Sequence, residues 1–343
     1  MSAFVVSEAA PVGASFTSSL APHLEAYLKL MRAVGRRYER VERILRQLDR
    51  FVAKEPQEGV ILTRDLLGRW LASAPHLAPA TLRAHASAAR QFCRYMARIE
   101  PRTWIPDGSL CPARIPRFQP HIFSVSDLRN LFAAANQCPS KHWWLRTQSL
   151  QTLLLLLYAT GLRINEALLL RLADVDLDQR ILFVAETKFF KARWVPFSTS
   201  LAEQLHAYRA VRDVAITASN PDDPFFISSR RRPYSYSHVH RTFQRLLQEV
   251  GIDTSATRRG TARLHDLRHT FAVHCVLRWY REGADVRAKL PLLATYLGHA
   301  SVLSTHVYLH ATTAILEEAS QRFERVYGSL GIAPQEEICD VLG

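Results

Sequence analysis

The residues that decide the fold lie in the segment Leu264-His265-Asp266-Leu267-Arg268-His269-Thr270-Phe271. Side chains three residues apart share one face of a helix, so His265 and Arg268 are expected to lie side by side. The segment therefore predicts a helix, near Asp266, that presents an imidazole and a guanidinium together.

Four other segments of the same half of the chain carry reactive or charged side chains. One places Arg163 directly after a glycine turn, at the mouth of an apolar helix, in Thr160-Gly161-Leu162-Arg163-Ile164-Asn165-Glu166-Ala167-Leu168. Taken alone, this segment favours a surface arginine paired with Glu166. The remaining segments are Leu297-Gly298-His299 with Tyr308 nine residues later, Thr187-Lys188-Phe189-Phe190-Lys191 in an expected turn, and Ser229 to Arg232 with three arginines.

Length and charge indicate a two-domain protein with an anionic partner. The chain has 343 residues, which exceeds one ordinary core. It carries 44 Lys and Arg against 31 Asp and Glu, a formal charge of +13, which predicts a polyanion or an acidic surface as partner.

Its five cysteines form no metal-binding or CxxC spacing, so we expect reduced thiols in a cytoplasmic protein. No signal peptide is expected, and the leucine run 153–157 is far shorter than the ~20 residues of a membrane span.

The first half of the chain predicts a small all-helical domain over residues 16–105, after a loose tail at residues 1–15. Apolar residues at helical spacing form one stripe within 41–51 and a second within 82–96. Arginines lie off both stripes, and we expect DNA contacts from Arg83, Arg90 and Arg94. A solvated arginine-rich face is the alternative. Residues 106–121 hold four prolines and form the expected linker, with Arg114 and Arg117 suited to contact phosphates.

Residues 122–330 form the expected second domain, and residues 331–343 form a C-terminal tail. Helices are predicted at 126–136, 146–159 and 164–171, followed by short strands at 181–184 and 193–197 with a turn at 186–191. Helical patterns resume near Leu201, Ser237 and Asp266, and Gly251 is placed to end the second of these helices.

Together these segments resemble the tyrosine recombinases, the phage integrase family, over the whole second domain and more loosely over the first. The resemblance implies a mainly α fold with a small β-sheet: an N-terminal helical, SAM-like core-binding domain and a C-terminal α+β catalytic domain. It assigns the family's catalytic positions to Arg163, Lys188, His265, Arg268, His299 and Tyr308. The family's turn often reads Gly-Lys-Gly-x-Lys, whereas Thr187 and Phe189 stand at the glycine positions here, so Lys191 competes with Lys188. At position 269 the family more often has a packing residue.

The chemistry of phosphodiester cleavage agrees with these residue types. Two guanidiniums can hold the non-bridging oxygens as negative charge builds on them, which is the role expected of Arg163 and Arg268. A phenol of pKa ~10 needs a proton acceptor at neutral pH, so His265 is expected to serve Tyr308 as base. Lys188 would protonate the departing 5′ oxygen, and His299 would donate a hydrogen bond to the phosphate. The resemblance implies a 3′ phosphotyrosine intermediate and no metal or other cofactor.

The resemblance also implies partners. We expect duplex DNA recombination sites, a homotetramer on DNA with exchange of residues 331–343, and accessory recombinases, in an integrase or transposase of a mobile element at the nucleoid. Further DNA contacts are expected from Arg230, Arg231, Arg232 and Arg241.

One alternative function is that of a recombinase-like DNA-binding regulator without catalysis. A zinc hydrolase using His265 and His269 is disfavoured because Asp266 replaces the usual Glu and no third ligand is evident. A metal-dependent transposase or nuclease would need a carboxylate cluster, which the sequence lacks.

Overall fold

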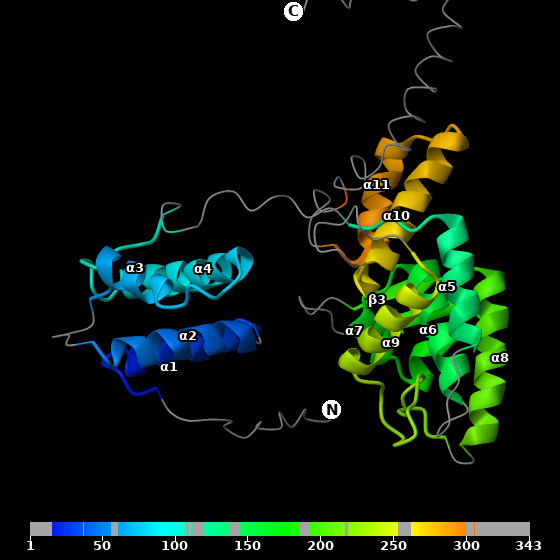
Figure 1. Cartoon of the computed structure of the whole chain (residues 1–343), viewed down its shortest axis with the longest axis horizontal. Coiled ribbons are helices and arrows are strands. Elements are labelled where there is room, and N and C mark those ends of the chain that lie inside the picture. The colour runs from blue at the N-terminus through cyan, green and yellow to red at the C-terminus, as the bar shows by residue number, and fades with distance from the viewer. Residues whose placement is uncertain are drawn as a thin grey trace, which may run out of the picture. The chain divides into compact units, whose positions relative to one another are not determined.

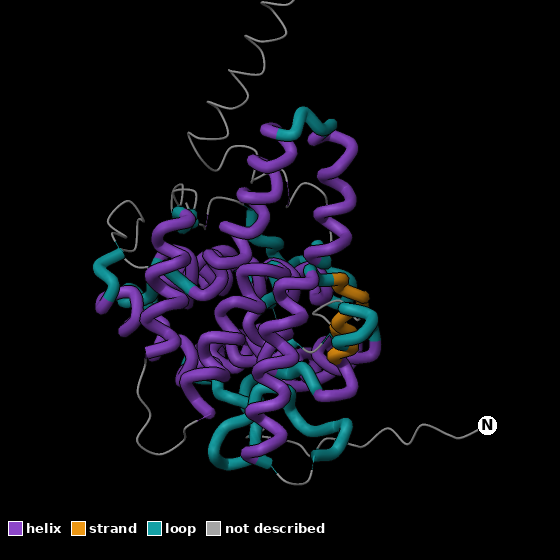
Figure 2. The backbone as a smooth tube through the Cα atoms, turned by 90° about the vertical axis from the view of Figure 1, so that its right-hand side faces the viewer, coloured by secondary structure: helices purple, strands orange, loops and turns teal. Residues whose placement is uncertain are grey.

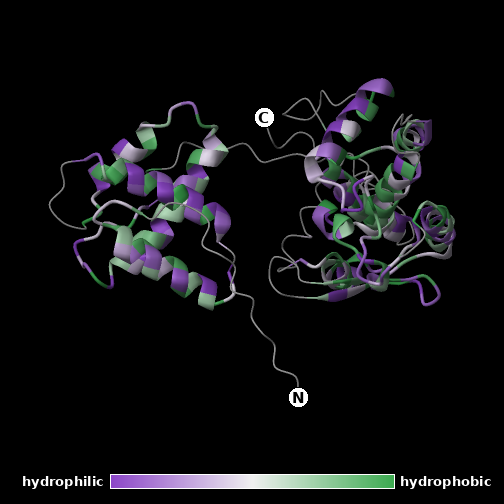
Figure 3. Cartoon of the chain, turned by 90° about the horizontal axis from the view of Figure 1, so that it is seen from below, coloured by the Kyte–Doolittle hydropathy of each residue, from purple (hydrophilic) through white to green (hydrophobic). Residues whose placement is uncertain are grey.

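The chain divides into two compact units, Met1–Arg117 and Phe118–Gly343, each with its own core (Figure 1). The computed structural model describes residues 16–36, 38–55, 61–107, 110, 120–137, 145–185, 192–216, 219–252, 262–299 and 305. Hydrophobic residues of the second unit gather at its centre, whereas helices of the first unit carry distinct hydrophilic and hydrophobic sides (Figure 3). Among the described helices, none is long and apolar enough to cross a membrane.

Helices build the described part of the first unit: α1 (Ala21–Ala33), α2 (Glu39–Val52), α3 (Arg64–Ala72) and α4 (Pro79–Met96). The start of α3 is capped by the Thr63 hydroxyl, which accepts a hydrogen bond from the backbone N–H of Leu66 at 3.2 Å. Proline begins α4, at a helix position where a missing N–H costs nothing. The predicted apolar stripes of α2 and α4 are both buried in this core.

A buried carboxylate ties the segment before α1 to α2. Asp49 is 2% exposed and accepts hydrogen bonds from the backbone N–H groups of Thr17 and Ser18 at 2.8 and 3.0 Å. The Ser18 hydroxyl donates a further bond at 2.6 Å. These hydrogen bonds join the chain before α1 to α2, so Asp49 fixes where the chain enters the first unit.

The second unit packs its helices around α6 (Leu145–Thr160), which has no exposed residue along its length and contacts α5 (Val125–Gln137), α8 (Thr199–Ala215) and α10 (Leu264–Arg281). The other helices are α7 (Ile164–Leu168), α9 (Tyr236–Glu249) and α11 (Val286–Leu297). Helices α10 and α11 project from the body as a pair joined by a short loop (Figure 2). Strands β1 (Val175–Asp176), β2 (Ile181–Val184) and β3 (Arg193–Pro196) form an antiparallel sheet in the order β1-β2-β3.

The predicted fold class, mainly α with a small sheet, is confirmed, but one helix prediction was too long. Helix α7 ends at Leu168 rather than at residue 171. Leu170 and Leu172 instead exchange backbone hydrogen bonds with Phe225 and Asp223 of a distant loop, and a short 3-10 turn follows at Leu172–Asp174. Those longer-range bonds replace the helical ones that the local sequence favours. Gly251, with φ of +64°, follows α9 as predicted.

The chain turns between α6 and α7 at Gly161, and only glycine fits there. Its φ is +61°, and a Cβ atom would lie 2.7 Å from both Leu297 Cδ2 and Phe271 Cδ1. Gly251 has nearly the same backbone conformation but open space around it. The two glycines therefore separate the cost of backbone strain from the cost of crowding.

We expect Gly161→Ala to lower the free energy of unfolding by about 2–5 kcal/mol, because left-handed strain adds to overpacking. Gly251→Ala carries the strain alone and should cost about 1–2 kcal/mol. Urea unfolding followed by circular dichroism measures both. Equal losses in the two variants would contradict the close approach of Leu297 and Phe271 to Gly161.

Candidate active site

Helix α10 supplies the predicted His265, Arg268 and His269. The helix begins where buried Asp266, 1% exposed, accepts a hydrogen bond from the backbone N–H of Arg263 at 2.8 Å. This contact caps the N-terminus, where a negative charge is also favoured by the helix dipole. His265 and His269 lie one turn apart with ring centroids 4.8 Å apart and ring planes at 89°. The predicted neighbours on one helical face are thus brought to one end of α10.

The guanidinium of Arg268 joins two helix ends. It is 1% exposed, and it donates from Nη1 to Gly161 O at 2.8 Å and from Nη2 to Leu297 O at 2.7 Å. Gly161 directly follows α6, and Leu297 is the last residue of α11. Helix C-termini carry unpaired carbonyls and a partial negative charge, so a buried cation is stabilised between them.

Arg163 lies at the start of α7 and is held by two segments. Its Nη1 donates to Glu166 Oε1 at 2.7 Å, and its Nη2 donates to Gly298 O at 3.1 Å. The Glu166 carboxylate also accepts from the backbone N–H of Arg163 at 3.0 Å. The ion pair with Glu166 that the sequence suggested is present, yet Arg163 remains 35% exposed and open to a ligand.

Sequence reasoning missed Arg193, which it placed only as the first residue of a strand. Its Nη2 and Nη1 donate to the two oxygens of Glu166 at 2.8 and 3.2 Å, and its Nε donates to Tyr296 O at 2.9 Å. The side chain is 11% exposed. A charged residue in a short strand gives no signal of this contact, because Glu166 lies 27 positions earlier.

His299 follows the left-handed C-terminus of α11. Gly298 has φ of +67°, and the backbone N–H of His299 donates to Ala294 O at 2.9 Å, which closes the helix end. The Nδ1 atom of His299 lies 2.8 Å from Oγ1 of buried Thr305, the one described residue beyond position 299. The ring is thereby oriented from its Nδ1 side.

Burial and surrounding arginines keep the three imidazoles neutral. Desolvation, followed by the charge of Arg268 and Arg163, lowers the pKa of His299 to about 4. Desolvation and Arg268 lower that of His265 to about 4. His265 retains an exposed surface, so the neighbouring guanidiniums are the firmer cause of its shift. For His269, desolvation and then His265 lower the pKa to about 3.

Glu166 balances part of this positive charge. Its burial opposes ionisation, but its bonds with Arg193 and then Arg163 outweigh that effect and lower its pKa to about 2. The described site thus contains three guanidiniums, two of which bond to the Glu166 carboxylate, beside three neutral imidazoles. This surplus of positive charge suits an anion, and within the described residues no group of three His, Cys, Asp or Glu side chains is placed to share a metal ion.

Several predicted residues lie outside the described ranges: Lys188, Lys191, Tyr308, Arg114 and Arg117. The other predicted DNA contacts lie within the described residues. Arg83 and Arg94 are exposed on α4, and Arg90 donates from Nε to Pro106 O. Arg230 to Arg232 are exposed before α9, and Arg241 is exposed on it.

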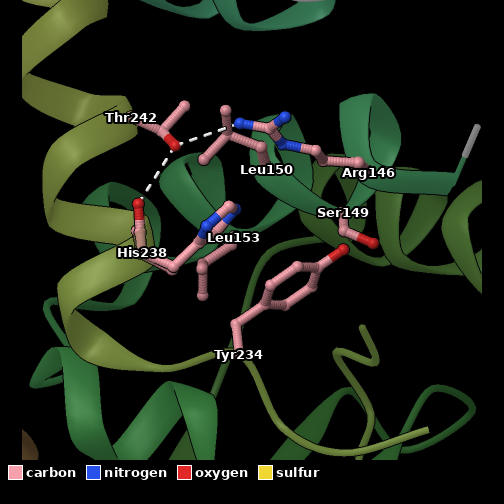
Figure 4. Close-up of a pocket in the computed structure, with 8 residues that line it drawn as sticks. Arg146, Ser149, Leu150, Leu153, Tyr234, His238 and Thr242 are labelled. Carbon is pink, nitrogen blue, oxygen red and sulfur yellow. Dashed lines mark hydrogen bonds between the residues drawn. The ribbon is translucent and has the colours of Figure 1, made fainter. Parts of the chain in front are cut away.

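A small pocket, partly open to solvent, lies between α6 and α9 (Figure 4). Arg146 Nη2 donates to the Thr242 hydroxyl at 3.3 Å across it, and that hydroxyl donates to His238 O at 3.0 Å. None of the predicted catalytic residues lines this pocket. It is therefore separate from the arginine and histidine site.

Comparison with known proteins agrees with this geometry. Residues 123–314 match the model of the phage integrase family. The chain is 33% identical over 304 residues to the putative integrase/recombinase y4rB of Sinorhizobium fredii, covering 88% of this chain and 96% of that protein. It is 31% identical over 234 residues to the tyrosine recombinase XerD of Caulobacter vibrioides, covering 68% and 72% of the two chains.

Two solved structures share the fold at low sequence identity. XerH bound to palindromic difH substrate, in a post-cleavage complex, is 20% identical with a TM-score of 0.63, covering 90% of this chain and 85% of that one. A lambda integrase dimer bound to a COC′ core site is 16% identical with a TM-score of 0.59, covering 85% and 95%. With the family model matching more than half of its length, this chain belongs to the phage integrase family of tyrosine recombinases.

Proposed function

We propose that this chain cuts and rejoins DNA at specific sites through a covalent 3′ phosphotyrosine at Tyr308. The observation that carries the proposal is the pair of guanidiniums, Arg163 and Arg268, both anchored on backbone carbonyls at the end of α11, near His265 and His299. Arg268 binds Gly161 O and Leu297 O, and Arg163 binds the adjacent Gly298 O. The family to which the chain belongs supports the same reading.

The arginines would stabilise the phosphate in the transition state. Negative charge grows on its non-bridging oxygens as the phosphorus becomes five-coordinate, and charge-assisted bonds to fixed donors stabilise it. Arg163 is the more exposed of the two and would contact one oxygen directly. Arg268, which is almost completely buried, would stabilise the phosphate through its fixed positive charge.

Proton transfer would accompany each change in bonding. The phenol oxygen of Tyr308 forms a bond to phosphorus while the bond to the 5′ oxygen breaks. His265, neutral at pH 7, can accept the phenol proton, since its lowered pKa leaves a ring nitrogen free of charge. Lys188 would give a proton to the 5′ oxygen, and Lys191 is the competing donor. The tyrosyl ester retains the bond energy, so a 5′ hydroxyl can reverse the step without ATP.

We further propose that the chain acts as a homotetramer on two duplex sites, with residues 331–343 exchanged between neighbours and accessory recombinases as partners. The exposed arginines on α4, in the loop before α9 and on α9 would contact phosphates. The similarity to the putative integrase/recombinase y4rB favours an integrase or transposase of a mobile element. The domain limits expected from the sequence would place the core-binding domain at residues 16–105 and the catalytic domain at 122–330.

The alternatives differ from this proposal in their chemistry. A DNA-binding regulator without catalysis would bind DNA and form no covalent link. A zinc hydrolase would use His265 and His269 as ligands and would lose activity in a chelator. Family membership favours the recombinase over both, and one assay distinguishes them.

Wild-type protein should form a denaturant-resistant adduct with nicked suicide duplexes from the DNA flanking its own gene, with EDTA present. Tyr308→Phe should bind the same DNA and form no adduct, because its ring has no hydroxyl to attack phosphorus. Gel electrophoresis under denaturing conditions measures the adduct. An adduct in the Phe variant would move the nucleophile elsewhere. Specific binding without any adduct from the wild type would favour the regulator, and an adduct lost only in EDTA would favour a metal mechanism.

Alanine variants of the two lysines should separate their roles. We expect Lys188→Ala to slow adduct formation by about 10²–10⁴-fold, the usual contribution of a general acid, and Lys191→Ala to change it little. A duplex with sulfur at the 5′ bridging position should restore the rate of Lys188→Ala, because a thiol of pKa ~8.5 leaves without a proton. Rescue of Lys191→Ala instead would transfer the role to that residue.

The neutral histidines should make stability depend on pH. Their folded pKa values, about 3 to 4, lie below the ~6.5 of an unfolded chain, so the unfolded chain binds more protons between pH 4 and 6.5. The free energy of unfolding should therefore fall as pH falls from 7 to 5 in urea titrations. His269→Asn should reduce this fall relative to the wild type. An identical fall in the wild type and in His269→Asn would contradict a buried neutral His269.

A further inference from the structure

We infer that Arg193 is a positioning residue for DNA cleavage, which orients Arg163 through Glu166 and links strand β3 to the segment that carries His299. The inference rests on the proposed role of Arg163 at the phosphate. Each of the three guanidinium nitrogens of Arg193 donates to Glu166 or to Tyr296 O, so the contacts that the structure shows for its guanidinium are with the protein itself.

Glu166 stands between the two arginines and is 8% exposed. Arg193 contacts both of its oxygens in a forked geometry, which fixes the plane of the carboxylate. The same carboxylate receives Nη1 of Arg163 at 2.7 Å. With its plane fixed by Arg193, Glu166 determines the direction of the Arg163 guanidinium, whose other end reaches Gly298 O.

Arg193 also contacts the end of α11. Its Nε donates to Tyr296 O, and a Cβ atom on Gly298 would lie 2.9 Å from its Nη1 and 3.1 Å from its Cζ. The guanidinium therefore lies against the backbone of Gly298, one residue before His299. Glycine is required there both by φ of +67° and by this contact.

Without Arg193, Glu166 would keep a single guanidinium partner in a buried position. A buried carboxylate with less compensation protonates more readily or moves toward water. Either change would release Arg163 from its present direction. A misplacement of about 1 Å at a reacting centre can cost about 10²-fold in rate, so the effect should appear in cleavage rather than in DNA affinity.

The test compares Arg193→Met, Arg193→Lys and Arg171→Met in the full chain. Arg171 is the matched control, since it makes a similar forked contact with a buried carboxylate, Asp174, at 2.9 and 3.1 Å outside the site. We expect the single-turnover rate of adduct formation at saturating DNA to fall about 10–100-fold in Arg193→Met. The dissociation constant for DNA should stay unchanged in the same variant. Arg193→Lys should recover part of the rate, because it keeps the charge and loses the fork.

Two further readouts separate positioning from a general loss of structure. In Arg193→Met, adduct formation should fail at mildly acidic pH at which wild type and Arg171→Met remain active, because Glu166 would then protonate at higher pH. Adding Glu166→Gln to Arg193→Met should lower the rate no further than either change alone, since both act on Arg163 by one route. Additive losses of rate in the double variant would overturn the inference. So would a decline of the Arg193→Met rate at acidic pH that matches that of the wild type.

A crystal structure of Arg193→Met decides the inference independently of cleavage. Loss of the bond between Arg163 Nη2 and Gly298 O would support it, and an unmoved Arg163 would overturn it. If the wild type forms no adduct, the proposed function fails by itself, and this structural readout still applies. If Arg193→Met does not fold, Arg193→Lys supplies the same comparison.

Discussion

The architecture of the second unit depends on one buried cation held between two helix ends. Arg268 fills the space where α6 and α11 both terminate, and it satisfies a carbonyl from each. Removing an isolated guanidinium from water is costly, and only fixed partners and favourable helix dipoles offset that cost. Because these partners come from residues 161 and 297, the fold must bring two distant segments together before this charge can be buried. The functional site is therefore part of the structural core.

Three further charged side chains lie at the same end of α11 as Arg268: Arg163, Glu166 and Arg193. Glu166 lies between Arg163 and Arg193, and the backbone of Gly298 lies against both arginines. Desolvation and then the surplus of positive charge lower the pKa of the His299 imidazole, and Arg163 is 35% exposed. The requirements of holding the structure and of binding phosphate are thus met by different atoms of the same side chains.

Much of this site could be predicted from local sequence. The spacing of His265 and Arg268 predicts a shared helical face, and the glycine before Arg163 predicts a turn, because both signals depend on nearby residues only. Arg193 could not be predicted, since its partners lie 27 and 103 positions away. The early end of α7 was missed for the same reason: Phe225, far along the chain, supplies the bond that replaces a helical one. The positions proposed for Lys188 and Tyr308 lie outside the described residues.

The burial of α6 along its whole length has a consequence for how the second unit folds. A helix that is covered on every side gains little from forming alone in water and is stabilised mainly by its neighbours. Its neighbour α5 directly precedes it in the chain, whereas α8 begins 39 positions and α10 104 positions after its end. Closing such long loops precedes most of the stabilising contacts, which makes the folding reaction slow and strongly cooperative. The amides of α6 should accordingly exchange with solvent only when the whole unit opens.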